Sequence, residues 1–166
     1  MSQQSGAIGP SRSPRASTGL PFDGLAARHQ DTVLLLGRVA LGVIFVTSGL
    51  HKLLGLDAFA ASLASKGVPL AAVFAPLGAG VEFLGGSAIV LGLATRASAL
   101  LMLVFVVVAT GISHRYWEFE GAVRVSQEIN FDKNLCIFGG FILMFAAGAG
   151  RFSVDGLRRM RTNQPS

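Results

Sequence analysis

Four apolar stretches constrain this chain more than any other feature of its sequence. They cover about residues 32–50, 70–93, 97–112 and 135–149. An α-helix rises 1.5 Å per residue, so about 20 residues cross the hydrocarbon core of a bilayer. The last two stretches reach that length only if their polar flanks enter the interface. A soluble bundle would need a polar face on each helix, and the run LLMLVFVVVA has none. The pattern predicts an all-α membrane protein, a bundle of four transmembrane helices.

The composition supports the membrane assignment and argues against a nucleic-acid partner. Charged residues make up 14% of the chain, against about 25% in soluble domains. The net charge of +5 could indicate nucleic acid, but the basic residues lie beside the apolar stretches and form no stripe on a recognition fold. The single cysteine, Cys136, excludes an intramolecular disulfide and a cysteine-ligated cluster.

The chain divides into a tail, a membrane domain and a second tail. Residues 1–31 are rich in Ser, Pro, Gly and Arg and predict a disordered tail. Residues 32–155 form the four-helix transmembrane domain, and residues 156–166 form a basic tail. Eight Lys and Arg residues lie in the two tails and the Thr95-Arg96 turn, against five in the other two loops, where acidic residues accompany them. The positive-inside rule therefore predicts that both termini are cytoplasmic.

Two charged residues interrupt the apolar stretches, and we expect both to face the bundle interior. Arg38 lies in the first stretch and Glu82 in the second, where a charge facing lipid would cost roughly 2.5–3.5 kcal/mol. Each shares a helix face with small residues that allow close helix packing. The predicted packing glycines are Gly42, Gly49, Gly78, Gly85 and Gly86.

The depths of these two charges predict a pair. Arg38 and Glu82 fall within about two helical turns of each other in antiparallel helices. Two interpretations stay open. A buried Arg38–Glu82 ion pair would fix packing, whereas a polar site would bind a ligand, a quinone head group or protons. Without a partner, Glu82 could instead be protonated by desolvation.

A second polar group of residues is expected at the outer surface, where Lys52, His114 and Lys133 lie beside several carboxylates. His114 could exchange a proton near neutral pH or could be a plain interfacial residue. The sequence has no metal-ligand spacing, no P-loop and no GxGxxG. We therefore expect no metal, and a flavin or nicotinamide would have to come with a partner protein.

A series of short motifs extends between residues 38 and 155. They are Arg38, Ser48-Gly49 with Lys52-Leu53, Phe59, Lys66-Gly67-Val68-Pro69, Glu82 with Gly85-Gly86, Leu91-Gly92-Leu93-Ala94-Thr95-Arg96, His114, Asp132-Lys133-Asn134-Leu135, Gly139-Gly140, and Gly148-Ala149-Gly150-Arg151-Phe152-Ser153-Val154-Asp155. In their order and spacing, these motifs resemble the DoxX family of small bacterial membrane proteins. Two positions depart from the family pattern: Asp132 replaces an expected glutamate, and Ala149 replaces a common proline. The resemblance implies a four-helix protein of the bacterial inner membrane.

The resemblance also implies redox work, as a membrane subunit of a quinone-linked or oxidative-stress-related system. In that role Arg38, Lys52 and Lys133 would bind the quinone or oxyanions, and Glu82 or His114 would accept a proton. Quinone is then the expected cofactor, and soluble redox enzymes are the expected partners. Two other functions stay open: a non-catalytic scaffold that recruits soluble redox enzymes, and a small transporter, which would need to form a homo-oligomer.

Overall fold

The computed structural model describes residues 21–162, and this part of the chain is helical throughout apart from its turns. Its elements are α1 (Pro21–Arg28), α2 (Gln30–Leu54), α3 (Leu56–Ser65), α4 (Ala71–Leu91), α5 (Thr95–Ser113), the short 3-10 helix η1 (Tyr116–Glu118), α6 (Gly121–Ala147) and α7 (Val154–Thr162). Four segments are long and apolar enough to cross a membrane: α2, α4, α5 with η1, and α6. The prediction of an all-α protein with four spans is confirmed.

The fourth span is longer than its hydropathy indicated. α6 begins at Gly121, whereas the predicted span began at residue 135. The polar side chains of its first half lower the hydropathy of that segment, so hydropathy did not indicate a span there. They do not interrupt the backbone hydrogen bonds of the helix. The rings of Tyr116 and Trp117 in η1 lie 5.4 and 6.3 Å from the ring of Phe131. These aromatic contacts hold the first half of α6 against η1.

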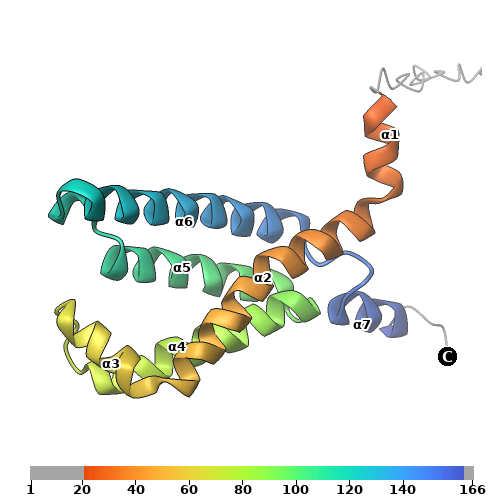
Figure 1. Ribbon diagram of the computed structural model, residues 1–166. Coiled ribbons are helices and arrows are strands. Elements are labelled where there is room, and N and C mark those ends of the chain that lie inside the picture. Colours follow the sequence, from red (N-terminus) through yellow and green to blue (C-terminus); the bar gives the residue numbers. More distant parts are fainter. Residues whose placement is uncertain (1–20, 163–166) are drawn as a thin grey trace, which may run out of the picture.

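The four spans form two antiparallel pairs, α2 with α4 and α5 with α6, and α4 and α5 connect the pairs (Figure 1). Glycines let α2 approach α4. A Cβ on Gly49 would lie 2.6 Å from the backbone nitrogen of Phe83, and one on Gly42 would lie 2.9 Å from the carbonyl oxygen of Gly86. Such distances are closer than side chains allow, so the two backbones are in direct contact.

Gly86 packs on α2 as well, since its Cβ would lie 2.7 Å from that of Phe45, and the other two predicted packing glycines face different neighbours. Gly85 lies against the side chain of Met102 on α5. Gly78 faces the ring of Phe59 on α3, where a Cβ would be 4.0 Å from the nearest ring atom. α4 therefore presents small residues to three helices, and the core beside it consists of Phe45, Ile89, Ala99, Met102, Val106, Phe141 and Met144.

The short helices lie at opposite ends of the bundle (Figure 1). α1 and α7 lie at one end, here named the α7 end, and α3 and η1 lie at the other, here named the α3 end. Two of these helices fall in the predicted tails. Residues 21–28 of the expected N-terminal tail are helical in α1, and α7 covers most of the expected C-terminal tail. The predicted disorder of residues 1–20, and the tail residues 163–166, lie outside the described part of the chain.

The turn between α4 and α5 is closed by α7. Gly92 and Ala94 have positive φ angles of 65° and 43°. The carboxylate of Asp155 in α7 accepts hydrogen bonds of 2.8 Å from the backbone amides of Ala94 and Thr95. Burial alone would raise the pKa of Asp155, but these amides and the nearby Arg158 outweigh it, so the pKa lies below its ordinary value. Asp155 thus caps α5 from outside that helix.

Candidate functional site

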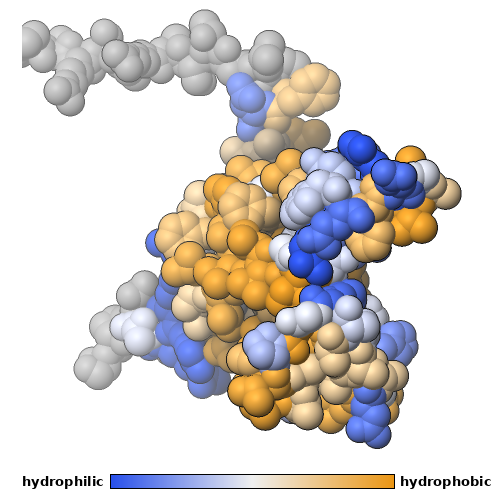
Figure 2. Space-filling view, turned by 90° about the vertical axis from the view of Figure 1, so that its left-hand side faces the viewer, coloured by the Kyte–Doolittle hydropathy of each residue, from blue (hydrophilic) through white to orange (hydrophobic). Residues whose placement is uncertain are grey.

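A cavity with a volume of about 840 Å³ lies at the α3 end. Its walls are mainly apolar and include the rings of Phe59, Phe74 and Phe105 from α3, α4 and α5. Its polar lining is basic: Lys52, Lys66, His114 and Arg115 all contribute. Seen from this end, hydrophilic residues lie between the two halves of the face, with apolar surface on either side (Figure 2). The cavity therefore combines a hydrophobic interior with cationic groups.

Lys52 connects this cavity to the bundle centre through an ion pair. Its Nζ lies 2.5 Å from Oε2 of Glu82 and 5.2 Å from the centre of the Phe59 ring. The side chain of Glu82 is 5% exposed and that of Lys52 is 32% exposed. Phe74, Gly78 and Glu82 follow each other at steps of four on α4, so Glu82 continues the cavity-lining face one turn deeper. The lysine thus neutralises a buried carboxylate and still reaches the cavity.

His114 is the C-cap residue that follows α5, and it lies on the cavity wall. Its backbone nitrogen donates to the carbonyl of Thr110, and its Nδ1 lies 2.8 Å from Oε1 of Gln127 on α6. A second α5–α6 contact joins Asn134 Nδ2 to Thr110 Oγ1 at 2.9 Å. The imidazole is therefore held by two helices.

Arg115 connects two segments of the cavity wall. Its guanidinium donates a 3.2 Å hydrogen bond to the carbonyl of Lys66 in the α3–α4 loop and lies 3.2 Å from Oε1 of Glu118. Sequence reasoning did not select Lys66 or Arg115 as site residues. Lys66 appears in a motif of the family resemblance, and the fold of α3 back over α4 is what brings it to the same cavity as Arg115.

Arg38 lies at the α7 end, far from this cavity. Its side chain donates to the carbonyl oxygens of Ala149 and Phe152, at 2.5 and 2.6 Å, and Arg38 is 2% exposed. Lys52 is 14 residues further along α2, about 21 Å at 1.5 Å per residue. The predicted Arg38–Glu82 ion pair is wrong: Glu82 pairs with Lys52, and Arg38 binds the α6–α7 loop.

The register of α2 against α4 explains this error. Gly49 contacts Phe83, so Glu82 is level with Gly49. Arg38 comes 11 residues before Gly49, about 16 Å along the helix, and lies beside Gly92. An estimate of depth from predicted span ends did not resolve this difference.

Lys133, which sequence reasoning grouped with Lys52, does not line the cavity. It lies on α6, is exposed, and donates to Oδ1 of Asn130 at 2.8 Å. The structure therefore brings together Lys52, Glu82 and His114 of the predicted site residues, and it places Arg38 and Lys133 elsewhere. No group of three His, Cys, Asp or Glu residues suited to a metal occurs within residues 21–162.

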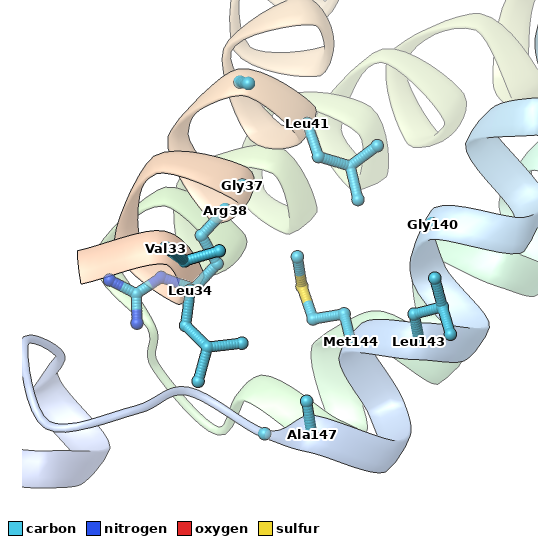
Figure 3. A pocket seen from close by; sticks show the side chains of 11 residues that line it. Val33, Leu34, Gly37, Arg38, Leu41, Gly140, Leu143, Met144 and Ala147 are labelled. Atoms are coloured by element: carbon cyan, nitrogen blue, oxygen red, sulfur yellow. The ribbon is translucent and has the colours of Figure 1, made fainter. Parts of the chain in front are cut away.

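A second cavity of about 490 Å³ lies between α2 and α6 near the α7 end. Figure 3 shows Leu34, Leu41 and Met144 lining it, while the guanidinium of Arg38 turns away from it. Its other lining residues are apolar or glycine. Such apolar walls give a ligand no directed hydrogen bond, so the α3-end cavity is the candidate functional site.

These features define a small polytopic membrane protein. It has four membrane-length helices, two interior charges with partners, and a basic cavity at one end. The chain belongs to the DoxX family, whose family model matches residues 33–115. That match includes Lys52, Glu82 and His114 and ends before α6.

Named relatives share most of the chain. It is 35% identical over 134 residues to "Inner membrane protein YphA" of Escherichia coli, covering 81% of this chain and 94% of the relative. It is 33% identical over 128 residues to "Inner membrane protein YqjF" of the same organism, covering 77% and 93%. It is 27% identical over 126 residues to "Uncharacterized membrane protein Rv3486" of Mycobacterium tuberculosis, covering 71% and 76%. No solved structure matches.

Proposed function

We propose that this DoxX-family protein is an inner-membrane subunit of a quinone-linked redox system, with its quinone site in the α3-end cavity. One observation carries the proposal: a single cavity joins three phenylalanine rings to Lys52 and His114. A quinone is a flat apolar ring with two carbonyl acceptors, and it needs apolar walls with a few well-placed donors. The relatives named as inner membrane proteins support the inner membrane as the location.

The charged residues would divide the work. An ammonium group has three donors, so Lys52 can bind Glu82 and still donate to a quinone carbonyl. Glu82 would hold the lysine in place. His114 would exchange the proton, because an imidazole nitrogen can either accept or donate one. A soluble partner protein would carry the electrons.

Binding of a quinone to the purified protein tests the proposal. We expect wild-type protein in mild detergent to bind a short-chain naphthoquinone. The double variant Lys52→Met/Glu82→Leu removes the donor without stranding a buried charge, and it should bind at least about tenfold more weakly, a loss of roughly 1.4 kcal/mol. Lys133→Met is the matched control, because Lys133 lies outside the cavity. Equal affinity in all three proteins, or no binding to wild type, would refute the proposal.

The α7 end favours a second function, a scaffold for soluble redox enzymes. Arg158, Arg159 and Arg161 are exposed on α7, where they could bind an acidic protein surface. Replacing the three with glutamine should abolish recovery of soluble partners in a pull-down while quinone binding persists. Recovery of the same partners by the variant would exclude this role for α7.

A further inference from the structure

The hydrogen bond between His114 and Gln127 fixes more than the position of the ring. Nδ1 of His114 faces the amide oxygen of Gln127 at 2.8 Å. An amide oxygen only accepts hydrogen bonds, and a neutral imidazole carries its hydrogen on one nitrogen. With the Gln127 amide in this orientation, the pairing puts the hydrogen of a neutral ring on Nδ1 and leaves a lone pair on Nε2.

The other ring nitrogen belongs to a residue of the cavity wall. His114 lines the α3-end cavity, whereas Gln127 does not. No residue in the described part of the chain forms a hydrogen bond with Nε2, because the contacts of His114 are those of its backbone and of Nδ1. Nε2 is thus the ring atom left for a bound molecule.

We propose that Gln127 is a positioning residue that holds His114 in the Nδ1-protonated tautomer, so that Nε2 acts as an acceptor in the cavity. The inference rests on the proposed function for the identity of the ligand, but not for the tautomer. It divides the site chemically. Lysine and arginine face groups that accept, such as a quinone carbonyl. His114 faces a group that donates, such as a hydroxyl, and receives the proton when that hydroxyl loses it.

The tautomer can be measured directly. In protein labelled with 15N-histidine at pH 9, the two ring nitrogens of a neutral imidazole have distinct shifts, and His114→Gln assigns the signal among the three histidines. We expect wild type to show protonated Nδ1 and unprotonated Nε2. Gln127→Leu should shift the population toward protonated Nε2, and Gln127→Glu, which keeps an acceptor, should retain the wild-type form.

Asn134→Leu is the matched control. It also removes an amide of α6 that binds a side chain of α5, but that side chain is Thr110. Its His114 signal should match wild type. A wild-type His114 protonated on Nε2, or a tautomer unchanged by Gln127→Leu, would overturn the proposal.

Ligand affinity gives an independent measurement. The probes are 2,3-dimethyl-1,4-naphthoquinone and its hydroquinone. Gln127→Leu should weaken hydroquinone binding about tenfold, the loss of one hydrogen bond, and leave quinone binding unchanged. Equal weakening of both probes would show that Gln127 acts through the fold and would overturn its positioning role. If neither probe binds wild type, the quinone function fails, while the tautomer result still decides the role of Gln127.

Discussion

The two residues of the Lys52–Glu82 pair should respond differently to substitution, because only one is fully buried. Lys52→Met strands a carboxylate that is 5% exposed, and breaking a buried pair costs roughly 3–5 kcal/mol. Glu82→Leu leaves a lysine that is 32% exposed and can turn into the cavity, so we expect a loss of about 1 kcal/mol.

The double variant should recover most of the larger loss, since an apolar pair of similar volume is often neutral. Thermal unfolding in detergent measures all three changes. Additive losses would show that the two side chains do not interact.

Arg38 should matter for stability and not for ligand binding. Arg38→Met leaves the buried carbonyls of Ala149 and Phe152 without their donor, and each such group costs about 1–3 kcal/mol. We therefore expect a lower melting temperature and an unchanged quinone affinity. Loss of quinone affinity without loss of stability would show that Arg38 takes part in ligand binding.

The sequence predicted which charges are interior but not how they pair. Arg38 and Glu82 had to face inward because lipid does not solvate a charge, and both are buried. The partner of Glu82 depends on the register of α2 against α4, and the partners of Arg38 lie in the α6–α7 loop. Neither follows from the periodicity within one helix. Gln127 was missed for a similar reason, since an uncharged residue near a helix start gives no signal until α5 lies beside it.

The α2–α4 interface depends on contact between backbones, which can be tested within one helix. Gly49→Ala would place a Cβ 2.6 Å from the backbone of Phe83, and overpacking of this kind costs about 1–3 kcal/mol or more. Gly37→Ala meets nothing within 4 Å and should be neutral or stabilise by up to about 1 kcal/mol, because alanine is the better helix former. Equal melting temperatures for the two variants would contradict this packing.

The cap that Asp155 gives to α5 should depend on pH. Its folded-state pKa lies below the ordinary value, so its contribution is fully present above the unfolded pKa of about 3.9 and is lost as pH falls through the folded pKa. Asp155→Ala should cost about 0.5–2 kcal/mol at pH 7.

Melting temperatures of both proteins should then converge below about pH 4. Asp31, whose carboxylate accepts a hydrogen bond from the amide of Arg151, provides a control for general acid effects. A difference between wild type and Asp155→Ala that stays constant to pH 3 would exclude a role for the carboxylate charge.

At the level of elements, apolar length identified the four spans but not their ends. α3 and α7 were not predicted, because each is short and owes its position to neighbours: α3 packs on α4, and Asp155 ties α7 to α5. The first half of α6 was missed because hydropathy measures burial in lipid, whereas helices also continue into the interface.

For the whole molecule, the orientation in the membrane is a prediction from charge alone. Four spans put both termini on one side, and the excess of basic residues at the α7 end predicts that this side is the cytoplasm. In a Cys136→Ala background, a cysteine at Thr162 should resist impermeant thiol reagents in intact cells. A cysteine at Glu120, at the α3 end, should react. The reverse pattern would place the α3-end cavity on the cytoplasmic side.

The bonds from Arg38 to the α6–α7 loop have a consequence for biosynthesis. Arg38, the donor, and Ala149, the nearest acceptor, are 111 residues apart in sequence. At about 5–20 residues per second, the ribosome needs roughly 6–20 s to synthesise Ala149 after Arg38. Throughout that interval the first span holds an arginine whose final partners have not been made. A ribosome stalled after Ala147 would have produced four complete spans and still an unfinished protein.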